Sequence, residues 1–124
     1  MIDVHLSSTA IAAGETLSGT LTWNAPNAKV PKKATISIGW VTEGRGTRDR
    51  RTVQEVALDP NQLASSQGVP IPFSLQIPPE GPITYNGSLI RIIWEMKVLI
   101  DLPGLFARDD KQSWQVEVLP RQPQ

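Results

Sequence analysis

Residues 70–103, which read PIPFSLQIPPEGPITYNGSLIRIIWEMKVLIDLP, decide the fold of this chain. Apolar residues alternate with other residues along 71–77 and again along the longer run 88–102. Successive side chains of a β-strand point to opposite faces, so this alternation predicts two strands with one buried face each. Between them, residues 78–82 hold four prolines or glycines and lead to Tyr85, Asn86 and Gly87. That composition predicts a stiff connection that ends in a turn.

The same alternation recurs along the rest of the chain. We expect further strands at 2–6, 16–23, 34–40, 52–58 and 113–118. No stretch shows a helical period over three turns, although the loop 61–68 has room for one helical turn. Strands with one apolar face must bury it against a second sheet. The sequence therefore predicts an all-β chain folded as a two-sheet antiparallel β-sandwich of about seven strands, of the immunoglobulin-like kind.

Two local features of this sandwich are also predicted. The polar stretch EGRGTRDRR at 43–51 has the composition of a hairpin tip between two strands. Residues 88–102 would span about 50 Å if fully extended. We therefore expect that strand to be bent, bulged or shared between the two sheets.

Composition restricts the class of protein. A chain of 124 residues corresponds to one domain, which we place at 1–120 with a polar tail at 121–124. The 12 basic and 12 acidic residues balance, which argues against a nucleic-acid partner. No apolar run is long enough to span a membrane. The absence of cysteine fits a reducing compartment, so we expect a cytoplasmic protein.

All four tryptophans lie on the apolar face of their predicted strands. We expect Trp40 and Trp94 in the core because they lie in the middle of apolar rows. Trp23 and Trp114 lie toward strand or loop ends, where a core position and an exposed one are both open. Exposed tryptophans would favour a surface that stacks on sugars or bases.

Several segments resemble the arrestin-like family. The strand FSLQIP at 73–78, the turn PITYNG at 82–87 and the strand IIWEMKV at 92–98 are similar to the family's successive strand, P-P-S-Y/F-x-G turn and following strand. Earlier, AGETLSGTL at 13–21 is similar to its opening strand. The resemblance covers most of the chain and concerns residues that fix turns and fill a core.

This resemblance implies an arrestin-like sandwich and a non-catalytic scaffold or adaptor that binds proteins through loops and sheet edges. Ile83 and Thr84 depart from the family's pattern, where proline and serine are usual. Arrestins, the retromer's arrestin-like subunit and bacterial sporulation-control proteins contain two such sandwiches in tandem, whereas this chain has room for one. Properties that depend on a second sandwich are therefore not carried over.

Six residues are expected to have structural roles, through core packing or turn formation: Trp40, Phe73, Pro78, Tyr85, Gly87 and Trp94. Gly87 follows Asn86 in the turn, so we expect it to adopt a positive φ.

Catalytic and metal chemistry find little support in the sequence. His5, the only histidine, lies on the polar face of its strand without a serine, histidine and acid arrangement. Asp101, Asp109 and Asp110 could approach one another, but they lack the alternating ligand spacing of a calcium loop. We expect no enzymatic activity, no metal and no cofactor.

One charge cluster remains, formed by Arg45, Arg48, Arg50 and Arg51. Guanidinium groups pair with carboxylates and phosphates, although a solvated hairpin tip is the simpler explanation of the cluster. The adjacent strand 52–58, with Val56 near its middle, has few features that would block pairing with another chain. We therefore predict a contact with a protein partner, or self-association, through this edge strand and its arginines.

The sequence thus favours a non-catalytic protein-interaction or scaffold module. The alternative is a carbohydrate- or small-ligand-binding β-sandwich that uses Trp23 or Trp114 and a loop carboxylate.

Overall fold

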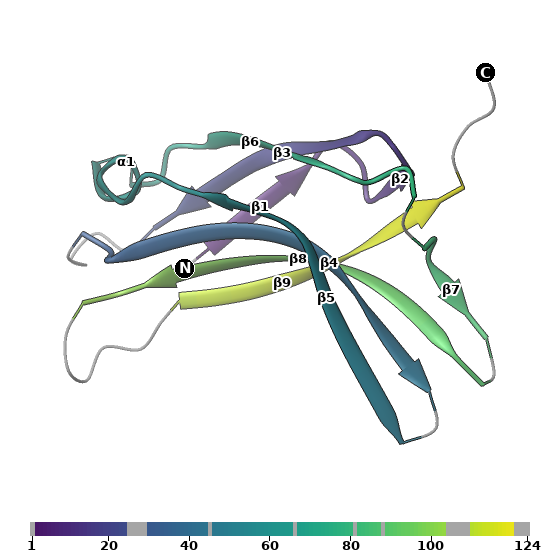
Figure 1. Ribbon diagram of the computed structural model, residues 1–124. Helices are drawn as coiled ribbons and strands as arrows, with labels where there is room; N and C mark the ends of the chain where they lie inside the picture. The colour runs from purple at the N-terminus through teal and green to yellow at the C-terminus, as the bar shows by residue number, and fades with distance from the viewer. Residues whose placement is uncertain are drawn as a thin grey trace.

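The protein, as a computed structural model, is described at residues 2–24, 30–44, 46–65, 67–80, 82–87, 89–103 and 110–120. Within this part of the chain, strands predominate and the single helix α1 (Pro60–Ser65) is short. The strands form two sheets that lie one above the other (Figure 1). The predicted all-β sandwich is confirmed. The polar tail expected at 121–124 lies outside the described residues.

The smaller sheet has three antiparallel strands in the order β1 (Ile2–Leu6), β3 (Thr16–Trp23) and β6 (Ile71–Gln76). The central strand β3 buries Leu17, Leu21 and Trp23 on the face toward the other sheet. Its threonines and serine lie on the opposite face, which matches the alternation read from the sequence.

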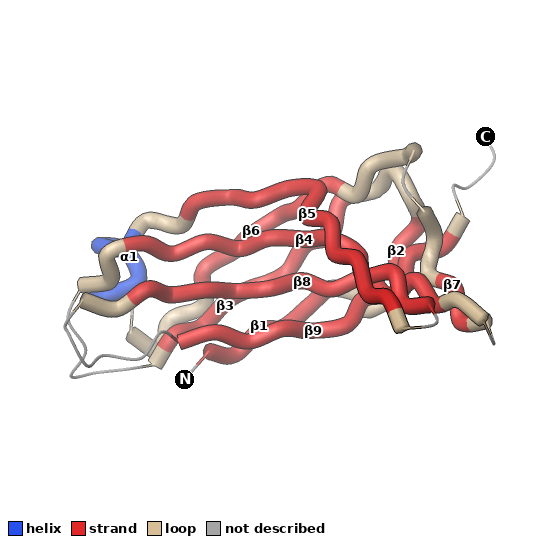
Figure 2. Tube along the Cα trace, turned by 60° about the horizontal axis from the view of Figure 1, so that its bottom comes forward, coloured by secondary structure: helices blue, strands red, loops and turns tan. Residues whose placement is uncertain are grey.

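The larger sheet runs from β5 (Thr47–Ala57) through β4 (Lys33–Gly44), β8 (Arg91–Asp101) and β9 (Asp110–Leu119) to β2 (Ala10–Ala12), as Figure 2 shows. Neighbours are antiparallel except β2, which pairs with β9 in parallel. The two-residue strand β7 (Tyr85–Asn86) pairs with the start of β8. The chain crosses from the small sheet to the large one between β1 and β2.

The hydrophobic core lies between the two sheets. The fully buried side chains with less than 2% exposure include those of Trp94, Met96 and Ile100 on β8, Ile36 and Ile38 on β4, and Leu17, Leu21, Trp23 and Leu75 on the small sheet. Burial of such side chains is the main favourable contribution to folding. The strongest alternation in the sequence therefore marks the residues that join the two layers.

The region predicted as a hairpin tip at 43–51 is mostly strand. Strand β4 continues to Gly44 and β5 begins at Thr47, so only a tight turn remains, in which Gly46 has a φ of +70°. This part of the hairpin projects past the small sheet (Figure 1). Because residues 47–52 of β5 are exposed on both faces, they need not alternate between apolar and polar, and no periodicity marks them as a strand.

Other strands also differ from prediction. The alternation does not predict β2 and β7, because strands of three and two residues are too short for an alternation to be recognised. The last strand begins at Asp110 and not at residue 113. Strand β8 is shorter than predicted, lies within one sheet and pairs with β4 without a register shift. The element that passes between sheets is the β1–β2 segment.

One residue-level prediction holds only in part, and one was wrong. Trp40 is only partly buried, because it lies on β4 beyond the stretch that the small sheet covers, although its ring still contacts Trp94. Gly87 does not have a positive φ, since the described residues with that conformation are Gly14, Gly46 and Gly68. A side chain at Gly87 is instead opposed by the Tyr85 ring, whose atoms would lie 2.6–2.9 Å from an added Cβ.

Candidate functional site

Strand β5 forms one edge of the larger sheet, at the opposite side from the three-residue strand β2. It pairs with β4 on one side only, and residues Thr47 to Thr52 are all exposed. The amide of Leu58 donates to the carbonyl of Ala34 on β4 at 2.8 Å. Because backbone groups alternate in direction along an antiparallel strand, the N–H groups of Glu55 and Ala57 point away from β4 toward the free edge. An uncovered edge of this kind can pair with another chain.

The edge of the smaller sheet at β6 is blocked at two of its three outward backbone positions, Gln76 and Pro72. The Gln76 amide donates to the side-chain oxygen Oε1 of Gln54 at 2.6 Å, so the outward direction at this position is already used. The backbone amide of Ser74, two residues earlier, points in the same outward direction. Pro72 lies at the next outward position and has no N–H to donate. The two edges on this side of the sandwich therefore differ, and β5 is the more open one.

The arginines predicted as one cluster lie on two faces of the hairpin. Arg48 and Arg50 lie on the outer face, where they contact Glu43 at 3.6 Å and Glu95 at 3.7 Å. Arg51 lies on the opposite face, with its guanidinium 6.0 Å from the centre of the Trp40 ring. Arg45 lies outside the described residues. The structure thus brings together Arg48 and Arg50 but separates them from Arg51.

Val56 differs from the other predicted contact residues. Its side chain packs against the core, and its amide has the same direction as that of Leu58, toward β4. A change at Val56 would therefore affect the β4–β5 pairing as well as the edge. Glu55 and Ala57 are the positions that address the edge itself.

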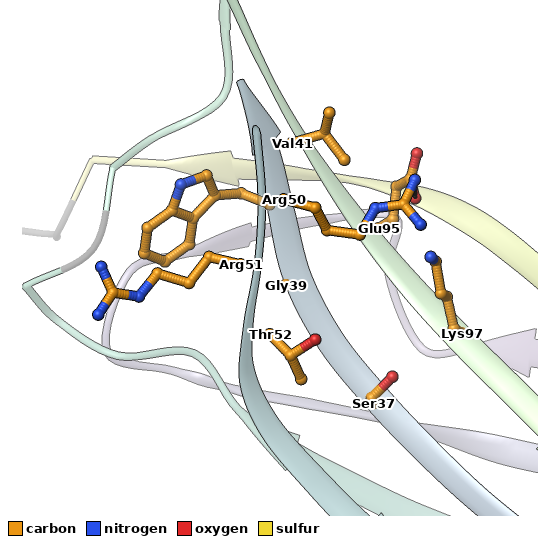
Figure 3. A pocket seen from close by; sticks show the side chains of 9 residues that line it. Ser37, Gly39, Val41, Arg50, Arg51, Thr52, Glu95 and Lys97 are labelled. Atoms are coloured by element: carbon orange, nitrogen blue, oxygen red, sulfur yellow. Dashed lines mark ion pairs between the residues drawn. The ribbon is translucent and has the colours of Figure 1, made fainter. Parts of the chain in front are cut away.

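The outer face beside β5 contains a second group of charges that the sequence did not single out. Arg50 reaches across β4 to Glu95 on β8, and the ammonium group of Lys97 lies next to this pair (Figure 3). Gly39 leaves β4 without a side chain at the crossing point. Burial lowers the pKa of Lys97 below its ordinary value of 10.5, and the neighbouring Arg50, Lys111 and Arg48 charges add to this effect against the opposing influence of Glu95. Positive charge therefore exceeds negative charge around Lys97.

The turn that carries the family resemblance is held to the sandwich by hydrogen bonds. The indole Nε1 of Trp94 donates to the carbonyl of Pro82 at 2.9 Å. Thr84 accepts from the Val118 amide through its hydroxyl at 2.8 Å and donates its own amide to the Val118 carbonyl at 2.9 Å. The hydroxyl at this position, where the family usually has serine, thus joins the turn to β9.

The remaining residues with predicted structural roles lie near this turn or at its approach. Phe73 packs partly buried against the core, and Pro78 is partly exposed just after β6. Tyr85 is 51% exposed on β7. Exposed apolar side chains gather at this end of the molecule, where Ile83, Leu89 and Ile90 also lie at the surface.

The residues considered for ligand or metal binding do not form one cluster, although Trp23 contacts Asp110. Trp23 is buried and its indole donates to Asp110 Oδ2 at 3.2 Å, whereas Trp114 is partly exposed. His5 is on the exposed face of β1, 3.5 Å from Asp3. Asp109 lies outside the described residues, and no group of three metal-ligating side chains occurs within the described ranges. Among the described residues, Trp23 contacts a carboxylate but has no exposed ring on which a ligand could stack.

The layout of the sheets and the position of the turn define an arrestin-like β-sandwich. Among solved structures, the chain is similar to Spo0M, the sporulation control protein from Bacillus subtilis, with a TM-score of 0.70 and 15% sequence identity. The match covers 94% of this chain and 48% of that one, so the chain spans about half of Spo0M's length. At this identity the likeness establishes the fold alone. No family model and no curated protein matches the sequence.

No helix in the described part of the chain is long and apolar enough to cross a membrane.

Proposed function

We propose that this protein is a non-catalytic interaction module of the arrestin-like type, which holds a protein partner or a second copy of itself along the free edge of β5. The observation that carries the proposal is the contrast between the two sheet edges. Strand β5 has outward N–H groups at Glu55 and Ala57, while β6 is occupied by Pro72 and by the Gln54–Gln76 hydrogen bond. An added strand gains main-chain hydrogen bonds at such an edge.

The arginines beside the edge give the contact its charge preference. Arg48, Arg50 and Arg51 outnumber the single carboxylate Asp49 in the exposed half of β5. Charges at the rim of an interface mainly set orientation and association rate, and salt screens them. A partner with acidic residues next to its pairing strand fits this surface. The absence of cysteine supports a cytoplasmic location as part of the same proposal.

The test compares three forms of the protein: wild type, Ala57→Pro, and the charge reversal of Arg48, Arg50 and Arg51 to glutamate. Ala57→Pro removes an outward donor without changing charge, and each variant is first checked for native circular dichroism. Self-association is followed by sedimentation velocity, and partner capture by quantitative pull-down. We expect both variants to lose an association that wild type shows. If both stay folded and associate as wild type does, the contact lies elsewhere and the proposal fails.

The carbohydrate-binding alternative receives no supporting observation in the described residues, since Trp23 is enclosed in the core.

A further inference from the structure

A basic groove crosses the outer face of the larger sheet. It is lined by Arg48 and Arg50 from β5, Glu95 and Lys97 from β8, and Lys111 from β9, and has a volume of about 700 Å³. Leu99, an apolar residue on this otherwise charged face, and Ser113 complete one wall. The groove therefore combines four cations, one carboxylate, an apolar contact and a hydroxyl.

The cations of this groove are unevenly compensated. Arg50 contacts Glu95, whose side chain is only 16% exposed, and Arg48 contacts Glu43, which also pairs with Arg91. Among the described residues, no carboxylate lies within ion-pair distance of Lys97 or Lys111. Two ammonium groups thus remain available for a ligand. The pKa of Lys97 is lowered first by burial, and the neighbouring Arg50, Lys111 and Arg48 charges lower it further.

The spacing of the charges indicates the shape of the ligand. The groove extends over β5, β4, β8 and β9, which at ordinary strand spacing is about 14 Å. One oxyanion cannot contact cations at both ends of this distance. An extended peptide advances about 6.7 Å for every two residues, so acidic residues at alternate positions would meet the lysine end and the arginine end together.

We propose that this groove binds an acidic, extended segment of a protein partner, with carboxylates placed against Lys97 and Lys111 and an apolar residue against Leu99. A second copy of the chain fits less well, because a two-fold contact would bring the same cations together. Nucleic acid is also disfavoured, because no aromatic side chain lines the groove for base stacking. The inference rests on the proposed interaction function and identifies a second surface for the partner.

The probe is a short fluorescent peptide that alternates serine and glutamate, compared with the same peptide carrying lysine. Binding is measured by fluorescence anisotropy to wild type, to Lys97→Gln/Lys111→Gln, and to the control Lys32→Gln/Lys33→Gln. The control removes the same charge, but Lys32 and Lys33, which are exposed, do not line the groove. We expect the groove variant to bind the acidic peptide about tenfold more weakly, the control to stay within about twofold of wild type, and the lysine peptide not to bind.

Backbone amide shifts give a second readout, and we expect the acidic peptide to perturb Lys97, Leu99 and Ser113. If Lys97→Gln disturbs folding, the exposed substitution Lys111→Gln alone is used and must still weaken binding. The inference is overturned if the control loses as much affinity as the groove variant, if wild type does not bind the peptide, or if inorganic phosphate or an oligonucleotide displaces it at equal concentration. Loss of peptide binding in Ala57→Pro but not in the groove variant would keep the edge proposal and reject the groove.

Discussion

At the scale of the residue, Trp94 joins the core to the turn that precedes its own strand. Its ring is completely buried, lies 5.3 Å from the Trp40 ring, and donates to the Pro82 carbonyl. We expect Trp94→Ala to lower the free energy of unfolding by about 3–5 kcal/mol. Trp94→Phe keeps an aromatic ring and removes the hydrogen bond. Urea denaturation followed by far-ultraviolet circular dichroism measures both, and an unchanged midpoint for Trp94→Ala would refute its core position.

Gly87 is constrained by a side chain and not by its own backbone conformation. An added Cβ would lie 2.6 Å from a ring carbon of Tyr85, which is itself half exposed. We expect Gly87→Ala to cost about 1 kcal/mol, and most of this cost to disappear when Tyr85 is replaced by serine. A double-mutant cycle of thermal stabilities measures the coupling. Equal cost in both backgrounds would point to a backbone origin.

Lys97 makes the stability of the folded protein depend on pH. Its pKa in the folded protein lies below the ordinary 10.5, so in the alkaline range below that value the unfolded chain binds more protons than the folded one. Lys97 therefore contributes a rise in the free energy of unfolding as the pH increases through this range. We expect Lys97→Gln to show a smaller rise than wild type, in parallel urea titrations between neutral and alkaline pH. Identical slopes would show that Lys97 is not perturbed.

At the scale of the element, the β4–β5 hairpin depends on Gly39. The register between the strands shifts between Ile38 and Gly39, and a Cβ at Gly39 would collide with the Arg51 carbonyl and lie 2.9 Å from the Cα of Thr52. Since these are backbone atoms, no side chain can move aside. We expect Gly39→Ala to lower the free energy of unfolding by about 1–3 kcal/mol, which is more than Gly87→Ala costs. Urea denaturation measures both variants. A cost below that of Gly87→Ala would mean that the bulge is easily rearranged.

The elements that could be predicted from the sequence are those with one buried face. Strands β3, β6 and β8 show the alternation because the core selects apolar residues at every second position. The outer half of the β4–β5 hairpin has no core beside it, so its residues follow no such pattern. Trp40 lies at the boundary between these two regimes, which is why its apolar position in the sequence did not translate into complete burial.

At the scale of the whole molecule, the two candidate surfaces differ in how far sequence could reveal them. The arginines at 45–51 lie close together in the sequence, so the sequence alone identifies them as a charge cluster. The groove draws Lys97 and Lys111 from separate strands, and only the pairing of β8 with β9 and of β4 with β8 places them beside Arg50. Leu99 stood out as an apolar residue on a charged face, but its neighbours could not be known before the strand order.

The central claim is that β5 is the edge at which this protein binds another chain. Amide hydrogen exchange of Glu55 and Ala57 tests it most directly, measured in the free protein at low concentration and again in the associated form, whether self-associated or with the captured partner. We predict fast exchange in the free protein and strong protection of both amides on association, because each would then donate to the added strand. Association that leaves both amides exchanging at their free rates would contradict the claim.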